Sequence, residues 1–275
     1  MIKDILVSLS SETNNAGVVA YAVSLASKFE AHLTGVAFAQ DPFVAGSMFD
    51  GVSVAVIEQY QEEAKNAAKA TAKQFEETTR GAAISGESRV IDTSVEGIGE
   101  SFGRLARRYD ISIVGQSENK GPAANLIIEG ALFASGRPTL VVPYTQRQGF
   151  KADRAVLCWD GSRSAARAFS DALPIIKRSG TVEVITIASK DSNKGEIAGA
   201  DIAHHLARHG IKAELNRIVA PDTDVSNTIL SYAADSSADL IVMGGYGHSR
   251  LREFVLGGAT RGILGSMTVP TLLAH

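Results

Sequence analysis

Cysteine is nearly absent from this chain of 275 residues, which contains only Cys158. A single cysteine excludes an intramolecular disulfide and any metal site built from several thiolates. This shortage is typical of proteins in a reducing compartment.

Neither sign of charge dominates, and long apolar runs are missing. The formal net charge is −3, which gives no reason to expect nucleic acid or an anionic membrane as a partner. No apolar run approaches the roughly 18–20 residues of a membrane span. The start, MIKDILVSLSSE, soon turns polar and lacks a small-residue cleavage site, so we expect no signal peptide. We therefore expect a globular, cytoplasmic protein.

What the chain does contain is an alternation of short apolar runs and helical spacing that occurs twice. The pattern restarts after a polar, linker-like stretch near residues 143–153. Residues 5–10 (ILVSLS) align with residues 155–160 (AVLCWD), and RPTLV near the end of the first pattern matches VPTLL near the end of the second. A repeat of this length indicates a duplicated domain.

We therefore expect two domains, a first repeat at 1–145 and a second repeat at 154–275. Because strands and helices alternate in each, each repeat is predicted to be α/β, with a Rossmann-like open parallel five-stranded sheet and helices on both faces. Ligands on such sheets bind beyond the carboxyl ends of the strands, where the strand order reverses.

The strongest local signal lies at residues 240–260, LIVMGGYGHSRLREFVLGGAT. A short apolar strand runs into a turn with Gly244, Gly245 and Gly247, and nine residues later the pair Gly257-Gly258 opens a new helical pattern. Glycines let backbone N–H groups approach an anion, and a helix N-terminus adds partial positive charge. This arrangement is typical of a phosphate-binding site.

With these residues in place, the sequence resembles a tandem universal stress protein over nearly its whole length. The family's nucleotide signature, Gly-x2-Gly-x9-Gly followed by Ser or Thr, is matched by three glycines at the right spacing, and the family's Asp after the first strand is matched by Asp160. The resemblance implies ATP, with or without Mg²⁺, as the cofactor. The residues it implicates in binding are Asp160, Ile187, Ala188, Met243, Gly244, Gly247, His248, Gly257, Gly258, Ala259 and Thr260. It also implies that the fifth strands, residues 139–142 and 271–274, pair to form an intrachain pseudo-dimer. A homodimer of chains stays open.

Two departures from the family pattern affect this interpretation. Gly258 stands where the family has Ser or Thr, so a hydroxyl hydrogen bond to a terminal phosphate is lost, worth about 0.5–1.5 kcal/mol. In the first repeat the turn reads Gly115-Gln116-Ser117-Glu118, and Ser10 replaces the Asp. Glu118 would set a carboxylate where phosphates belong, and Asn125 and Leu126 align with the second glycine pair. We therefore predict that the first repeat binds no nucleotide in this manner.

Several residues support two interpretations. Asp160 can contact a nucleoside or a nucleotide-bound Mg²⁺, or cap the next helix. His205 and His209, with Asp201 on the same predicted helix face, can hold a metal or be ordinary surface residues. The apolar stretch 41–56 can line a pocket, pack as core or contact a protein partner.

No Walker-type loop, Gly-x-Gly-x2-Gly fingerprint or Gly-x-Ser-x-Gly elbow occurs in the sequence. His248-Ser249 lies in the glycine turn, but a catalytic pair needs a geometry that sequence does not give. The leading hypothesis is a stress-response, ATP-binding protein that is not an enzyme or hydrolyses ATP only slowly. The alternatives are a nucleotide-free interaction or scaffold protein acting through protein partners, and an enzyme of the same fold that uses an adenylated intermediate.

Overall fold

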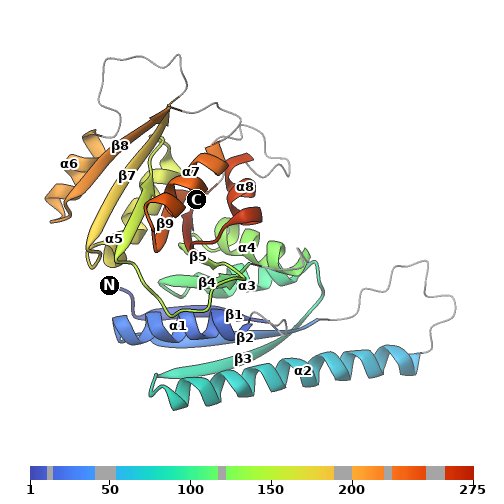
Figure 1. Ribbon diagram of the computed structural model, residues 1–275. Helices are drawn as coiled ribbons and strands as arrows, with labels where there is room; N and C mark the ends of the chain where they lie inside the picture. Colours follow the sequence, from blue (N-terminus) through green and yellow to red (C-terminus); the bar gives the residue numbers. More distant parts are fainter. Residues whose placement is uncertain (11–14, 41–53, 117–121, 189–199, 220–224, 246–257) are drawn as a thin grey trace. The chain divides into compact units, whose positions relative to one another are not determined.

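The computed structural model describes seven stretches of the chain, which Figure 1 shows as a coloured ribbon: residues 1–10, 15–40, 54–116, 122–188, 200–219, 225–245 and 258–275. By its contacts the chain divides into two compact units. The first unit comprises residues 1–137 and 147–150, and the second comprises residues 138–146 and 151–275.

The first unit alternates strands and helices, as its sequence predicts. Its strands are β1 (Asp4–Leu9), β2 (His32–Gln40), β3 (Gly86–Thr93) and β4 (Ile111–Gly115). Its helices are α1 (Asn15–Phe29), α2 (Val54–Gly81), α3 (Ile98–Ala106) and α4 (Pro122–Ala134). The strands lie in the order β3-β2-β1-β4, with β1 parallel to both β2 and β4, and β2 parallel to β3.

The second unit repeats this alternation. Its strands are β5 (Thr139–Val142), β6 (Arg154–Cys158), β7 (Thr181–Ala188), β8 (Ala213–Val219), β9 (Leu240–Gly244) and β10 (Thr271–Ala274). Its helices are α5 (Arg163–Ile176), α6 (Ala200–Arg208), α7 (Val225–Asp235) and α8 (Gly258–Ser266). The order is β5-β10-β9-β6-β7-β8, and the five strands from β10 to β8 are parallel. The predicted α/β class is confirmed.

Strand β5 is antiparallel to β10, with Leu140 opposite Leu272. The pairing predicted for the fifth strands of the two repeats is therefore confirmed. It also explains why β5, the last strand of the first repeat, groups with the second unit.

Both units place their helices on two faces of the sheet. In the first unit the chain moves from β1 through β2 to β3 in one direction along the sheet, and then returns past β1 to β4. Because crossover connections are right-handed, helices α1 and α2 lie on one face of the sheet. Helices α3 and α4 lie on the other face. The same reasoning separates α5 and α6 from α7 and α8. In keeping with it, α3 contacts α4 and α7 contacts α8.

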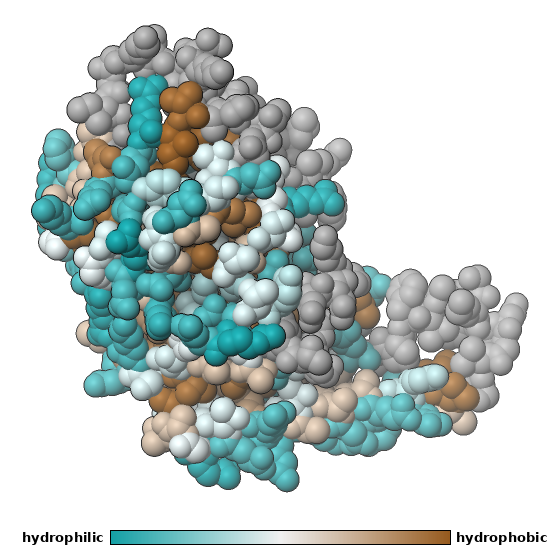
Figure 2. Space-filling view, viewed as in Figure 1, coloured by the Kyte–Doolittle hydropathy of each residue, from teal (hydrophilic) through white to brown (hydrophobic). Residues whose placement is uncertain are grey.

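The core consists mainly of the apolar strand residues, since parallel strands covered on both faces bury both sets of side chains. Residues of β1, β6 and β9 such as Leu6, Val156 and Val242 are fully buried. Helix α2, by contrast, carries exposed Glu62, Lys69 and Lys73, and hydrophilic side chains cover much of its outer side in Figure 2. These charged side chains form a solvated face of α2. Of the apolar stretch 41–56, residues 41–53 lie outside the described residues, and the last three begin α2.

Candidate functional site

Those predicted nucleotide residues that the structure describes lie at one edge of the second unit's sheet. Strand β6 lies between β7 and β9, with Cys158 opposite Ile185 on one side and Met243 on the other. All three strands are parallel, so their carboxyl ends meet at the same edge. The chain passes from β6 to β7 in one direction and reaches β9 in the other, so the strand order reverses between β6 and β9. This is where open α/β sheets bind ligands.

Four segments bring predicted residues to this edge. Asp160 follows β6, Ile187 and Ala188 end β7, Met243 and Gly244 end β9, and α8 begins with the three residues Gly258, Ala259 and Thr260. The first turn of α8 contains no acidic residue, so nothing there offsets the partial positive charge of its N-terminus. Gly247, His248 and Gly257 lie outside the described residues.

Gly244 is a glycine because α5 packs against it. A Cβ at Gly244 would lie 2.6 Å from the backbone nitrogen of Ala165 and 2.6 Å from Ser164 Oγ. No side chain fits at such distances, so the close approach of β9 to the start of α5 requires glycine here. Gly244 therefore has a packing role whether or not a ligand binds.

The turn after β6 positions the Asp160 carboxylate outside the helix cap. Asp160 Oδ1 accepts a hydrogen bond of 2.9 Å from the Ser162 backbone N–H, and Gly161 between them has a φ of 75°. The N-cap of α5 is Ser162, whose hydroxyl accepts from the Ala165 N–H at 3.1 Å. The hypothesis that Asp160 itself caps α5 is wrong. Asp160 instead closes the turn that precedes the cap, and its side chain is exposed at the strand edge.

The start of the glycine turn is tied to the end of β10, a contact that the motif did not predict. The Gly245 N–H donates to the Ala274 carbonyl at 2.8 Å, and His275 Nδ1 lies 3.0 Å from the Gly245 carbonyl oxygen. The amide of Gly245 is therefore already used. Any phosphate at this edge has to be held by other donors, such as the backbone N–H groups at the N-terminus of α8.

The start of α8 also has room for a larger residue. Among the described residues, no atom lies within 4 Å of a Cβ at Gly258, whereas the nearby Thr260 is 3% exposed. The glycine in the Ser/Thr position is thus not imposed by packing. A serine hydroxyl fits there.

Burial affects the thiol beside this edge. Burial, reinforced by the negative charge of Asp160, raises the pKa of Cys158 to about 12. A thiol with so high a pKa is almost wholly protonated at neutral pH and is a poor nucleophile. Cys158, at the end of β6, is therefore unsuited to nucleophilic catalysis at this edge.

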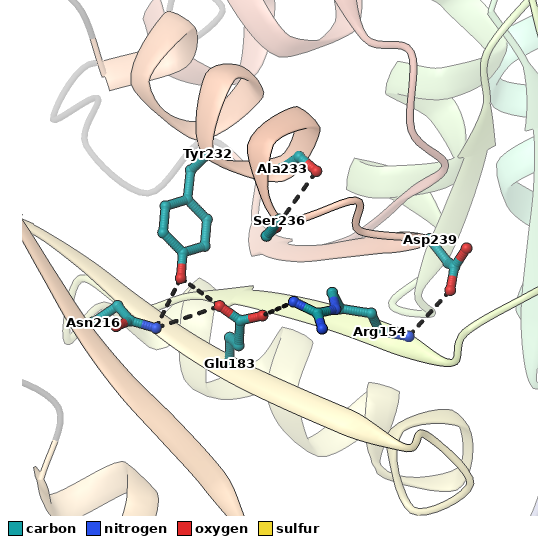
Figure 3. Close-up of polar contacts among 7 residues, drawn as sticks. All are labelled: Arg154, Glu183, Asn216, Tyr232, Ala233, Ser236 and Asp239. Carbon is teal, nitrogen blue, oxygen red and sulfur yellow. Dashed lines mark hydrogen bonds and ion pairs between the residues drawn. The ribbon is translucent and has the colours of Figure 1, made fainter.

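The second unit also contains a polar cluster that the sequence analysis missed, formed by Arg154, Glu183, Asn216 and Tyr232 (Figure 3). Glu183 is 5% exposed; its carboxylate accepts hydrogen bonds from the Tyr232 hydroxyl and from the Asn216 amide (3.3 Å), and lies 3.2 Å from Arg154 Nη1. Burial, and then the hydrogen bond to Glu183, raise the pKa of Tyr232.

This cluster lies at the amino ends of β6 and β7, at the opposite end of these strands from the predicted ligand residues. Arg154 begins β6 and Glu183 is the third residue of β7. The cluster links β6, β7 and β8 to α7 and is a structural feature. A glutamate in the apolar strand TVEVITIA was the only signal for it in the sequence.

His205 and His209, the pair that could bind a metal, have no third metal ligand among the described residues. The rings of His205 and His209 are 4.7 Å apart in an edge arrangement. Across the part of the chain that the structure describes, no group of three or more His, Cys, Asp or Glu side chains is placed to hold a metal ion. Within the same residues, no helix combines the length and apolar character that a membrane crossing needs.

The fold and this edge define a class of protein: an α/β protein of two repeats whose second sheet carries ligand-type residues at its point of strand reversal. Comparison with known proteins shows which family the second repeat resembles. The profile of the universal stress protein family matches residues 151–275. A universal stress protein of Synechocystis sp. is 28% identical over 142 residues, and the match spans 50% of this chain and 46% of that protein. Residues 151–275 therefore match the universal stress protein family, and the chain spans about half the length of the relative it matches.

Solved structures show how far the fold extends. A universal stress protein of Archaeoglobus fulgidus matches 98% of this chain and 96% of its own, with a TM-score of 0.74 and 16% identity. A putative universal stress protein of Pseudomonas aeruginosa matches 99% of this chain and 93% of its own, with a TM-score of 0.62 and 15% identity. At such low identity these likenesses establish the fold alone. They cover both repeats.

Proposed function

We propose that this chain is a cytoplasmic stress-response protein that binds one adenine nucleotide, ATP, at the carboxyl edge of the sheet in the second unit. Hydrolysis is at most slow, because the sequence offers no Walker-type lysine and no evident general base. One observation carries the proposal: residues implicated by the nucleotide signature come from four separate segments and lie at the point where strand order reverses.

The chemistry of the edge fits a nucleotide. The first turn of α8 offers backbone donors and partial positive charge to phosphates, with no acidic side chain to repel them. The exposed Asp160 carboxylate accepts a hydrogen bond from the Ser162 N–H, and a carboxylate at this edge suits a nucleoside hydroxyl or a nucleotide-bound Mg²⁺. Ile187, which is partly exposed near the end of β7, supplies apolar surface at the same edge.

Mass spectrometry of the gently purified protein tests the proposal first. ATP or AMP that co-purifies with the chain supports it. A protein that carries no nucleotide, and whose melting temperature millimolar ATP leaves unchanged, contradicts it and favours an interaction protein.

A pair of glycine variants then tests the location of the site. Gly247→Glu introduces in the second repeat the carboxylate that Glu118 supplies in the first, and we expect it to abolish ATP binding. Gly265→Glu is the matched control, because Gly265 is exposed on α8 and a Cβ there meets nothing within 4 Å. Unchanged affinity in Gly247→Glu would place the site elsewhere.

A further inference from the structure

The first unit contains a cavity of about 470 Å³ at the carboxyl edge of its sheet. The cavity lies where β1 and β4 end. Its lining includes Ser8, Leu9 and Ser10 at the end of β1, and Val114 and Gln116 at the end of β4. The strand order of this unit reverses between β1 and β4. The cavity therefore occupies the first unit's ligand position. Its volume lies within the range of small-molecule sites, about 300–1,000 Å³.

The described residues that line this cavity are uncharged. Among the described residues that line it, none is Asp, Glu, Lys, Arg or His. The polar groups are hydroxyls and amides, from Ser8, Ser10, Asn15, Gln40, Thr71 and Gln116. The rest is aliphatic or aromatic, for example Val18, Phe38 and Ile127. Charged side chains appear in the neighbouring hollow, where Lys65 and Asp92 pair with each other at 3.1 Å.

Comparison of the two strand edges shows what the first unit lacks. Ser10 stands where the second repeat has the Asp160 carboxylate. Ser10 and Asn15 are also joined by a hydrogen bond, in which the Asn15 side-chain oxygen accepts from the Ser10 backbone N–H at 3.0 Å. A charged ligand would leave water for a cavity whose described lining residues carry no opposite charge, which is strongly unfavourable. An uncharged molecule does not lose the hydration energy of a charge, and it gains contacts with the apolar lining residues.

We infer that this cavity is a second ligand site, which takes an uncharged small molecule with a mostly apolar body and a few hydrogen-bonding groups. The buried side chains of Ser8 (7% exposed) and Gln116 (6% exposed) provide the polar contacts in its interior. This site is independent of nucleotide binding in the second unit, so either can fail without the other.

Two dyes that share a skeleton test the charge preference on the full chain. N-phenylnaphthylamine is uncharged, and anilinonaphthalenesulfonate carries the same rings with one negative charge. Fluorescence titration should give one bound N-phenylnaphthylamine per chain, at least tenfold tighter than the anion. Millimolar ATP should not displace it. Equal affinity for the two dyes, no binding of the uncharged dye, or displacement by ATP would overturn the inference.

Two tryptophan variants test whether the uncharged dye binds in this cavity. Ala124 is half-buried at the start of α4 and lines the cavity, so Ala124→Trp should fill it and weaken dye binding at least tenfold. Asn125→Trp is the control, because Asn125 is the next residue, exposed and outside the lining. Dye binding that is equal in the two variants would overturn the assignment.

An isosteric change gives a second readout that does not depend on filling space. Gln116→Glu places a carboxyl group in the buried lining. Dye affinity should fall at neutral pH and recover as the pH is lowered and the carboxyl group becomes neutral. An affinity equal to that of the original chain at every pH would contradict the site.

Discussion

Gly244 lies so close to Ala165 that a Cβ on Gly244 would come within 2.6 Å of the Ala165 backbone nitrogen. Two elements far apart in the sequence, the end of β9 and the first turn of α5, meet at this point. The first glycine of the nucleotide signature is thus required by the fold. At Gly258, near the end of the same signature, none of the residues that the structure describes lies close enough to impose a glycine.

The close approach of Gly244 to Ala165 predicts how one added methyl group changes the stability of the fold. Gly244→Ala should lower the free energy of unfolding by about 1–3 kcal/mol, because backbone atoms of α5 must move to accommodate it. Urea denaturation measures this. Gly265→Ala, on the exposed side of α8 with nothing within 4 Å, should change stability by less than about 1 kcal/mol. Equal losses in both variants would contradict the packing argument.

Gly258→Ser should strengthen ATP binding. The added hydroxyl can donate a hydrogen bond to a phosphate, and one such bond is worth about 0.5–1.5 kcal/mol, or roughly two- to tenfold in affinity. Calorimetric titration of ATP into both proteins measures the gain. Adenosine is the control ligand: because it has no phosphate, its affinity should not rise. A gain that is the same for adenosine would show that the serine acts on the protein and not on the phosphate.

Tyr232→Phe should destabilise the chain by about 1–3 kcal/mol, since it removes a hydrogen bond to the buried Glu183 carboxylate. Tyr60→Phe is the control, because Tyr60 is 57% exposed on α2 and should be nearly neutral. Denaturation of both variants at pH 7 makes the comparison. Equal effects would contradict the assigned role of the cluster.

The same variant predicts a pH dependence. The folded state raises the pKa of Tyr232, so the stabilising contribution of its protonated hydroxyl is complete below the unfolded value of about 10 and declines as pH rises beyond it. The stability difference between the original chain and Tyr232→Phe should therefore shrink above about pH 10. A difference that stays constant or grows as the pH rises further would be inconsistent with this sign.

Cys158 should resist alkylation. Its pKa of about 12, against a reference of 9.0, lowers the thiolate fraction at pH 8 by more than a hundredfold. Iodoacetamide labelling followed by mass spectrometry should be slow in the folded protein and fast in urea. Asp160→Asn should change the rate little, because burial is the larger cause. Rapid labelling of the folded chain would contradict the burial of the thiol.

The sequence predicted the features that depend on local pattern. Apolar runs at residues 5–9 and 240–243 became strands, and the second glycine pair correctly indicated that a helix begins at Gly258. The pairing of β5 with β10 followed from the family resemblance. The predicted roles of Asp160, Ile187, Ala188, Met243 and the glycines in nucleotide binding stay predictions.

Features that depend on how separate elements approach each other were not predicted. Tyr232 and Glu183 are 49 residues apart, and their contact requires the register of three strands and the placement of α7. Likewise, the tie between His275 and Gly245 follows from the parallel pairing of β10 with β9. A helix cap was one of the two interpretations of Asp160 because its residue type suits one, but Ser162 lies at the position where the helix begins.

The central claim is that one unit binds a nucleotide and the other does not. Isothermal titration of ATP into the full chain tests it most directly. The account predicts a single site per chain, lost in Gly247→Glu and kept in Gly265→Glu. Two ATP molecules per chain, or none, would contradict it.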